Sequence, residues 1–360
     1  MPEPRTITAA EAIREAQDVA LATDAAVCVI GEGVADPKGV FGTTVGLVNS
    51  HGPSRVIEMP LAENAFTGMA IGAAMMGQRP IVVHQRVEFS LLAMEQMVNS
   101  AAKLHYVSGG AHRVPLVIRL VVGRGWGQGP QHSQSLEAMF ATVPGIKVIA
   151  PALPADAKGM LLSAIADDNP VIVLEHRWIH YTEGAVDVGW AAEPLDGPRR
   201  LRAGDDVTVV AVSYMTLEAM QAVDTLAAEG IGVDLFDLRV IRPLNLDAVA
   251  ESVRRTSRLV TVDIGNRAFG VGAEIAQRIT EACFDDLRAA PMRIGLPDHP
   301  TPSSRSLAAA FYPRAEHIAE AAGGLAGLDA SAAGHVRDAL AKAREGVPLD
   351  VPHPSFRGPF

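Results

Sequence analysis

The sequence contains very little cysteine, with only Cys28 and Cys283 among its 360 residues. Cys28 falls in a segment typical of a buried strand and Cys283 in a segment with helical periodicity. Neither the number nor the placement supports a disulfide framework. We therefore expect both cysteines to be small apolar residues of the core.

Positive charge is also in short supply. The 31 lysine and arginine residues are outnumbered by 41 aspartate and glutamate residues, which gives a formal net charge of −10. This sign disfavours a surface for nucleic acid or for an anionic membrane. Small molecules and protein partners remain as the expected ligands.

Long apolar runs are absent as well. The uncharged run at residues 64–78 contains three glycines and is shorter than the ~20 apolar residues needed to span a bilayer. The charged N-terminal segment, MPEPRTITAAEAIREAQ, lacks the apolar stretch of a signal peptide. We therefore expect a cytoplasmic protein.

Several standard motifs are incomplete. The glycine pairs at 31–33 and 270–272 do not extend to the three-glycine fingerprint of a dinucleotide-binding turn. His176 and His180 have a spacing that zinc ligands use on a helix, but they follow a strand pattern and lack the glutamate of a metalloprotease. There is also no G-x-S-x-G elbow for a hydrolase nucleophile.

Apolar β-rich runs alternate with helical patterns along the chain, which is typical of an α/β fold with parallel sheets. A first helix is expected to begin at Thr8, since Glu11 completes a capping box. Strands are expected at 25–33, 55–59, 79–85, 114–122, 147–151, 170–176, 206–214, 232–240 and 258–265. Helices are expected at 64–77, 90–105, 155–167, 216–229 and 271–284.

The length favours two domains. Residues 1–188 and 206–322 each contain a run of strands and helices, and residues 189–205 are rich in glycine, proline and charge, as in a linker. Residues 323–360 open with a glycine hinge, contain one alanine-rich helix and end in a proline-rich tail.

Glu63 is the first candidate functional residue. It ends an extended segment and precedes a helix with Gly68, Gly72 and Gly77, whose small size lets another helix approach closely. A carboxylate at such a junction can be desolvated and can hold or share a proton. Alternatively, Glu63 is simply an acidic residue at a helix N-terminus, next to an ordinary helix–helix contact.

Glu63, four further residues and then Gly68-Met69-Ala70-Ile71-Gly72 resemble the Glu-x4-Gly-Φ-x-x-Gly signature of thiamine-diphosphate enzymes. From about residue 5 to 322 the chain resembles the beta subunit of the decarboxylating component of 2-oxo acid dehydrogenases. The matching motifs are GEGV at 31–34, PLAE at 60–63, EQMVNSAAKLHYVSGG at 95–110, GPQHSQS at 129–135, the segment 150–176 and DLRVIRPL at 237–244. The resemblance implies two doubly wound domains, a transketolase-like pyrimidine-binding domain at 1–188 and a transketolase C-terminal-like domain at 206–322.

The resemblance also implies roles for residues of the first domain. Glu63 would hydrogen-bond the aminopyrimidine ring of the cofactor and favour the tautomer that deprotonates the thiazolium carbon. Phe89 would stack on the aminopyrimidine, with a core aromatic as the alternative. Leu61 and Glu32 match positions that line the same pocket.

Two further assignments come from the resemblance. His132, in the HSQS motif, would stabilise or protonate intermediates and assist transfer to the acceptor. Some members of the family bind a structural potassium ion, mostly through backbone carbonyls, and an ordinary helix-to-strand turn is the alternative here. The matching positions are Leu116, Ala164, Ile165, Asp167 and Asn169.

A GDG motif, on which thiamine-diphosphate enzymes hold the diphosphate and Mg²⁺, does not occur in the sequence. In the family that this chain resembles, a separate alpha subunit carries that half of the site. The resemblance thus implies an α2β2 assembly in which this chain supplies the aminopyrimidine side.

The chain departs from the family's usual pattern near the HSQS motif, where Arg124, Trp126 and Gln128 stand in a loop that is commonly slim, and at Arg86. Such side chains would bind an anionic or sugar-like substrate or obstruct a lipoyl arm. Alternatively, they are solvated loop residues.

Our leading hypothesis is decarboxylation of a 2-oxo acid followed by acyl transfer to a lipoyl domain. The alternatives are a two-subunit carboligase that uses an aldehyde or ketone acceptor, and a non-catalytic scaffold subunit. The presence of Glu63, Phe89 and His132 together argues against the scaffold.

Overall fold

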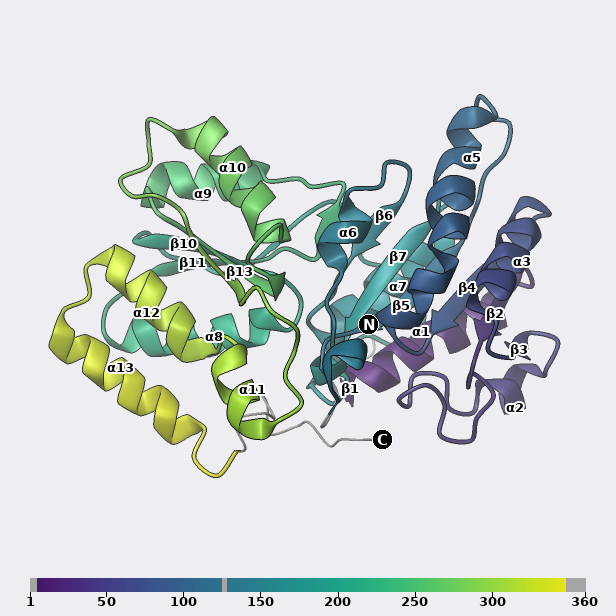
Figure 1. Ribbon diagram of the computed structural model, residues 1–360, viewed down its shortest axis with the longest axis horizontal. Helices are drawn as coiled ribbons and strands as arrows, with labels where there is room; N and C mark the ends of the chain where they lie inside the picture. Colours follow the sequence, from purple (N-terminus) through teal and green to yellow (C-terminus); the bar gives the residue numbers. More distant parts are fainter. Residues whose placement is uncertain (1–4, 125–127, 348–360) are drawn as a thin grey trace. The chain divides into compact units, whose positions relative to one another are not determined.

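The computed structural model describes residues 5–124 and 128–347 (Figure 1). They divide into two compact units, here called unit 1 (5–124 and 139–195) and unit 2 (128–138 and 196–347). Each unit contains strands and helices in alternation. The prediction of an α/β protein with two such bodies is therefore confirmed.

Unit 1 is built on a parallel sheet. Its strands are β2 (Val27–Gly31), β3 (Val56–Glu58), β4 (Arg79–His84), β5 (Val117–Val122), β6 (Lys147–Ile149) and β7 (Val171–His176). They lie side by side in the order β6-β7-β5-β4-β2-β3, and each neighbouring pair is parallel. All six coincide with predicted strands, because strands buried on both faces read as continuous apolar runs.

Helices cover both faces of this sheet. They are α1 (Ala9–Thr23), α2 (Leu47–His51), α3 (Glu63–Met75), α4 (Val87–Ser90), α5 (Ala102–Val107) and α7 (Pro154–Ala166), with shorter turns η1 (Leu91–Ala93), η2 (Gln96–Ala101) and η4 (Arg177–Ile179). Helix α1 packs against α7, and α3 packs against η1 and η2. The predicted capping box is confirmed: the Glu11 amide donates to the Thr8 hydroxyl, and the Glu11 carboxylate accepts from the Thr8 amide. A short antiparallel pair, β1 (Arg5–Thr8) with β8 (Glu183–Val186), joins the ends of the unit.

A buried ion pair lies in the middle of unit 1. Arg119 on β5 donates from Nε and Nη2 to the two carboxylate oxygens of Glu175 on β7, at 2.5 and 2.8 Å. Its remaining donors reach the Gln17 amide oxygen on α1 and the Thr43 hydroxyl, both at 2.8 Å. Burial alone would raise the pKa of Glu175, but the charge and hydrogen bonds of Arg119 outweigh burial and lower this pKa to about 2. The pair therefore contributes stability above pH 4.5 that is lost as the pH falls towards 2.

Replacing Arg119 with methionine should lower the free energy of unfolding by about 3–5 kcal/mol, because the Glu175 carboxylate would stay buried without its partner. Urea unfolding at pH 7 measures this loss. The control is Arg113→Met, at a side chain that is mostly exposed, where a change within about 0.5 kcal/mol is expected. A loss below about 1 kcal/mol for Arg119→Met would contradict the central role of the pair.

Unit 2 has a smaller sheet in the order β14-β13-β10-β11-β9. Its strands are β9 (Arg199–Arg202), β10 (Val207–Ala211), β11 (Val233–Asp237), β13 (Leu259–Asn266) and β14 (Met292–Leu296), and β12 (Val240–Arg242) follows β11 in the chain. The helices are α8 (Met215–Ala228), α9 (Asp247–Thr256), α10 (Val271–Cys283), α11 (Arg305–Phe311), α12 (Ala315–Ala326) and α13 (Ala330–Ala343). The pairs of this sheet are parallel except for β9, which is antiparallel to β11.

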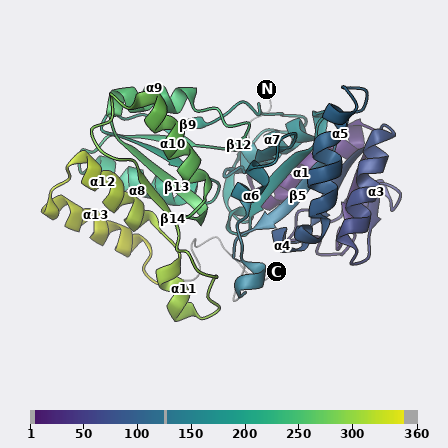
Figure 2. The same cartoon turned by 45° about the horizontal axis from the view of Figure 1, so that its top comes forward.

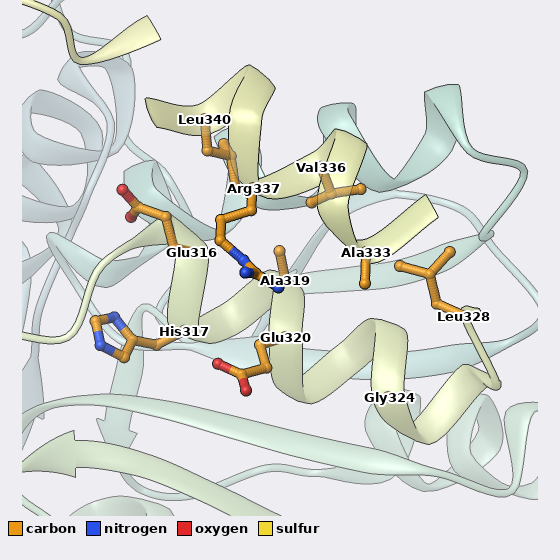
Figure 3. A pocket seen from close by; sticks show the side chains of 10 residues that line it. All are labelled: Glu316, His317, Ala319, Glu320, Gly324, Leu328, Ala333, Val336, Arg337 and Leu340. Carbon is orange, nitrogen blue, oxygen red and sulfur yellow. The ribbon is translucent and has the colours of Figure 1, made fainter. Parts of the chain in front are cut away.

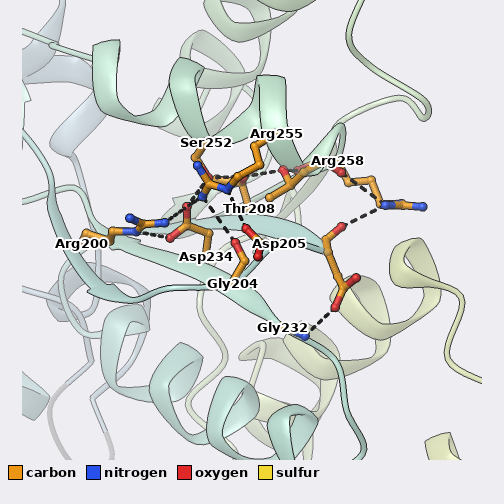
Figure 4. Close-up of polar contacts among 11 residues, drawn as sticks. Arg200, Gly204, Asp205, Thr208, Gly232, Asp234, Ser252, Arg255 and Arg258 are labelled. Atoms are coloured by element: carbon orange, nitrogen blue, oxygen red, sulfur yellow. Dashed lines mark hydrogen bonds and ion pairs between the residues drawn. The ribbon is translucent and has the colours of Figure 1, made fainter.

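Strand β9 lies within the segment 189–205 that the sequence predicts as a linker. Its sequence, RRLR, has no alternation of apolar and polar residues, so no strand signal is visible there. A buried carboxylate holds it in place: Asp234 on β11 accepts two bonds from Arg200, at 2.5 and 2.8 Å, and also pairs with Arg255 of α9 (Figure 4). The linker prediction was therefore wrong for the four residues of β9.

The glycine hinge expected at residue 323 is also absent, since Gly323 and Gly324 lie inside α12. A Cβ atom at Gly323 would come within 2.9 Å of the Leu328 side chain, so this glycine permits close packing rather than a bend. The turn occurs at Gly327, whose φ is +85°. Helices α12 and α13 then lie side by side (Figures 1 and 2) and border a partly open pocket of about 270 Å³ lined by residues that include His317, Leu328 and Val336 (Figure 3).

The expectations drawn from the scarce cysteine are confirmed. Cys28 is buried in β2, Cys283 is buried in α10, and neither forms a disulfide. Across residues 5–124 and 128–347, each helix is too short or too polar to cross a membrane.

Candidate active site at the carboxyl edge of the unit 1 sheet

Ligands of open parallel sheets bind outside the carboxyl ends of the strands. We call that edge of the unit 1 sheet the carboxyl edge. Glu32 directly follows β2, and Glu63 is the first residue of α3, which follows β3. Both carboxylates are largely buried, with 8% and 7% of each residue exposed. The structure thus brings together two of the acidic residues that the sequence selected.

We call the part of the carboxyl edge that carries Glu32 and Glu63 the acidic end. The carboxylates at and near this end differ in burial and in hydrogen-bond partners. Burial raises the pKa of Glu32, and the negative charges of Glu63 and Glu58 raise it further. Glu58 is already committed, since it accepts hydrogen bonds from the amides of Gly33 and Ala35 at 2.6 and 2.8 Å. In the described part of the chain, Oε1 of Glu32 is buried and finds no hydrogen-bond partner. The structure therefore sets the buried Glu32 carboxyl beside Glu63 at this edge of the sheet.

Phe89 and Leu61, the other two residues predicted to contact the aminopyrimidine, lie in different environments. Phe89 is half-buried in α4, and its amide donates to the Arg86 carbonyl at 3.2 Å. Leu61, two residues before Glu63, is 83% exposed. Leu61 thus lines no closed pocket of unit 1, and its role stays a prediction.

The other end of the carboxyl edge is basic. Arg86, Arg124 and Arg177 follow β4, β5 and β7, with 3%, 0% and 0% of each residue exposed. The alternative that Arg86 and Arg124 are solvated loop residues was therefore wrong. The sequence did not reveal this because arginine residues outside strands and helices are usually exposed. Gln128 is half-buried, and Trp126 lies outside the described residues.

His132 belongs to unit 2, where it ends the short turn η3 (Pro130–His132) and is half-buried. The hydroxyl of the next residue, Ser133, donates to the Gln128 carbonyl at 3.2 Å. Glu32, Glu63 and Phe89 all belong to unit 1. The structure therefore places those three residues in one unit and leaves the catalytic role of His132 a prediction.

A second carboxyl pair was not predicted from the sequence. One of its members, Glu137, lies five residues beyond His132, and the other, Asp263, lies on β13. Glu137, the first residue of α6 (Glu137–Ala141), reaches Asp263 on β13, and both are fully buried. Burial raises the pKa of both groups, whereas amide hydrogen bonds from Gly272 and Gly265 favour the charged form of Asp263. Glu137 is therefore the protonated partner and donates to Asp263. The visible signal was a single aspartate in the apolar strand RLVTVDIG.

Because the pKa of Glu137 is raised in the folded state, unfolded Glu137 ionises at lower pH than folded Glu137. Stability from this group is complete below pH 4.5 and falls as the pH rises. The glutamine of a Glu137→Gln variant donates its amide to Asp263 at every pH, so this variant should not lose stability as the pH rises. Its free energy of unfolding at pH 9 should exceed that of the wild type by about 1–2 kcal/mol. Urea unfolding at pH 5, 7 and 9 measures both curves, and parallel curves would refute the assignment of the proton to Glu137.

The residues matched to a potassium site surround the C-terminal end of α7, where the helix dipole favours a cation. The carbonyls of Ile165 and Asp167 converge on Nη1 of Arg79, each at 3.1 Å. The Leu116 carbonyl accepts from Val171, and the Ala164 carbonyl accepts from Asp167. Asn169 donates to the Asp167 carboxylate. This end of the helix thus gathers carbonyl oxygens and already holds one guanidinium.

Two family models match the chain, the pyrimidine-binding domain of transketolase at residues 5–180 and the C-terminal domain of transketolase at 198–318. The beta subunit of the pyruvate dehydrogenase E1 component from Porphyra purpurea is 40% identical, over 86% of this chain and 94% of its own length. The corresponding subunit from Rickettsia bellii is 39% identical, over 84% of this chain and 93% of its own length. The beta subunit of the acetoin:2,6-dichlorophenolindophenol oxidoreductase from Cupriavidus necator is 39% identical, over 86% of this chain and 95% of its own length.

Among solved structures, a split-gene transketolase described as an inactive beta4 tetramer matches with a TM-score of 0.70 and 21% identity. The match covers 89% of this chain and 99% of that one, and it supports the fold alone. The identity to the E1 beta subunits is much higher and extends through both units. The chain therefore belongs to the transketolase-like, thiamine-diphosphate-dependent family that includes the beta subunits of 2-oxo acid dehydrogenase E1 components.

Proposed function

We propose that this chain is the beta subunit of an enzyme that decarboxylates a 2-oxo acid with thiamine diphosphate and passes the acyl group to a lipoyl acceptor. The observation that carries the proposal is the buried pair of Glu32 and Glu63 at the carboxyl edge. The names of the pyruvate dehydrogenase relatives favour this activity over a carboligase.

The acidic end of the carboxyl edge suits the aminopyrimidine half of the cofactor. Oε1 of Glu32 is buried and has no hydrogen-bond partner among the described residues. Such burial costs free energy unless a ligand donates a hydrogen bond to this oxygen. Glu63 would hydrogen-bond a ring nitrogen, and Phe89 would offer an aromatic face for stacking. When bound, the cofactor would supply a carbon nucleophile and, in its thiazolium ring, an acceptor for the electron pair that stays behind when CO₂ leaves. Glu63 would hold and return the proton at the ring nitrogen, and His132 would act on later proton transfers.

The diphosphate and Mg²⁺ would be held by an alpha subunit, since the chain has no GDG motif. An exposed apolar surface supports such a partner and an α2β2 heterotetramer. Its residues lie before, on and after α3 and along the η1 to α5 segment: Leu61, Met69, Met75, Met76, Leu91, Leu92, Tyr106 and Val107. A Cβ atom at Gly72, on the same helix, would meet no atom of the described residues within 4 Å, so a partner has room to approach there.

Gly72→Leu should therefore weaken assembly with the alpha subunit by at least ~10-fold while leaving the fold intact, because the added side chain would fill the approach of the partner. Titration of the alpha subunit followed by light scattering measures the assembly. Gly334→Leu, at an open position on α13 in unit 2, is the matched control. Equal assembly of both variants would exclude α3 from the interface.

Three finer assignments belong to this proposal. Potassium would bind the carbonyls at the end of α7, where a carbonyl oxygen has a second lone pair beside the bond from Arg79. A higher melting temperature in potassium chloride than in sodium chloride would support that site.

A lipoyl acyltransferase would be the further protein partner. A cytoplasmic location stays a prediction, and some relatives are named as mitochondrial.

The decisive experiment offers a panel of 2-oxo acids to the reconstituted α and β chains, together with either a lipoyl domain or carbonyl acceptors, and identifies the products by mass. Acylated lipoyl domain is the expected product. Carboligation products without acylation would favour the two-subunit carboligase. No decarboxylation of any 2-oxo acid would refute the proposed function.

Glu63→Gln should slow hydrogen-deuterium exchange at the thiazolium carbon by ~10²- to 10⁴-fold, since the amide keeps the shape of the side chain but loses the proton relay. The exchange is followed by NMR in the reconstituted complex. Glu95→Gln, at a carboxylate outside the acidic end, serves as the control. An unchanged rate for Glu63→Gln would remove Glu63 from cofactor activation.

A further inference from the structure

Residues 128–138, which contain His132, belong to unit 2, although the described residues on either side of them in the chain belong to unit 1. We call residues 128–138 the histidine segment. The His132 amide donates to the Gly129 carbonyl at 3.2 Å, which closes a turn. This turn lies directly on Ser303, because a Cβ atom at Gly129 would come within 2.6 Å of Oγ of Ser303. The backbone of His132 is therefore carried by a turn that rests on unit 2.

Glu137, near the other end of the histidine segment, lies where the strand order of the unit 2 sheet reverses. Strand β10 lies between β11 and β13, and the chain runs from β10 to β11 on one side before it returns to β13 on the other. The last residue of β13 that pairs with β10 is Val262, opposite Ala211, and Asp263 follows it directly. Open parallel sheets bind their ligands beyond the carboxyl ends of two such strands. In unit 2 this position holds the side chain of Glu137, which is hydrogen-bonded to Asp263.

The hydrogen bond between Glu137 and Asp263 is anchored firmly on the Asp263 side. The Asp263 carboxylate accepts from the amides of Gly265 at 3.3 Å and Gly272 at 3.0 Å, which ties it to β13 and to the first turn of α10. Two buried carboxylates in contact cannot both be ionised, so one proton lies between them. Oε2 of Glu137 finds no hydrogen-bond partner in the described part of the chain, which leaves Asp263 as the side chain that holds this carboxyl group.

We propose that Glu137 is a positioning residue for His132: its hydrogen bond to Asp263 docks the histidine segment on unit 2 and thereby sets where the imidazole lies during turnover. This inference rests on the proposed function, in which His132 acts on the later proton transfers. Four residues lie between His132 and Glu137, so a displaced Glu137 would release the backbone that carries the imidazole. A misplacement of about 1 Å in a catalytic group can slow a reaction by ~10²-fold. Glu137 is itself buried, so it acts through His132.

The test compares Glu137→Met, which removes the donor, with Glu137→Gln, which still donates to Asp263. Two rates are measured in the reconstituted complex: hydrogen-deuterium exchange at the thiazolium carbon, which precedes the steps assigned to His132, and kcat with the acceptor that the enzyme uses. Glu137→Met should lower kcat by at least ~10-fold and leave the exchange rate unchanged, whereas Glu137→Gln should keep both wild-type values. The matched control is Ser252→Ala, which removes a donor at 2.5 Å from the buried Asp234 near the amino end of β11 and should leave kcat unchanged.

A double-mutant cycle shows whether the effect passes through His132. His132→Ala alone should lower kcat by at least ~10-fold, and adding Glu137→Met to it should cause no further loss. An equal loss with and without the imidazole would overturn the positioning role, as would a Glu137→Gln variant that is as slow as Glu137→Met.

A second measurement needs neither turnover nor a variant that folds poorly. Amide hydrogen exchange of the full-length wild-type chain, followed by mass spectrometry, should be at least ~10-fold slower in residues 129–136 than in the unfolded chain. Glu137→Met should remove this protection and Glu137→Gln should keep it. A histidine segment that is unprotected in the wild type, or equally protected in Glu137→Met, would overturn the docking. The absence of any decarboxylation by the wild-type enzyme would instead refute the proposed function and would leave the exchange of this segment unchanged.

Discussion

The ion pair between Arg119 and Glu175 is the constraint on which the carboxyl edge of unit 1 depends. Arg119 joins two adjacent strands to α1 and to the loop that contains Thr43. Glu175 directly precedes His176 and Arg177, so the pair fixes the point at which β7 ends. Thr43 lies two residues beyond Phe41, whose backbone φ is +50°, so the same guanidinium also anchors this loop. The basic end of the edge is thus positioned from within the core.

The acidic end is arranged by simpler means. Glu32 and Glu63 are placed by the ends of β2 and β3 together with the start of α3, and Glu58 ties the intervening loop to the amides of Gly33 and Ala35. Amide donors thereby compensate the charge of Glu58, whereas the buried Oε1 of Glu32 finds no hydrogen-bond partner among the residues that the structure describes. One sheet therefore carries carboxyl groups at one end of its carboxyl edge and guanidinium groups at the other.

The sequence predicted the parts of the fold that have strong local signals. The six strands of unit 1 are apolar runs, and the first helix begins with a capping box, so both could be read from neighbouring residues. The strand β9 could not, because its residues are polar and Asp234, which holds it, lies on a strand beyond α8. Glu63 was found through its junction with a glycine-rich helix. The burial of Arg86 and Arg124 and the pairing of Glu137 with Asp263 depend on contacts distant in the chain, which periodicity does not report.

The pairing of Glu137 with Asp263 also limits how the sequence can change. A Cβ atom at Gly265 would lie 2.0 Å from Oε1 of Glu137, well inside van der Waals contact. Any larger residue at 265 would therefore expel the Glu137 side chain and leave Asp263 without its proton donor. Conversely, a shorter residue at 137 would make room for a side chain at 265. A side chain at 265 is thus expected only together with a shorter residue at 137, so that an evolutionary path that changes position 265 first would pass through a less stable protein.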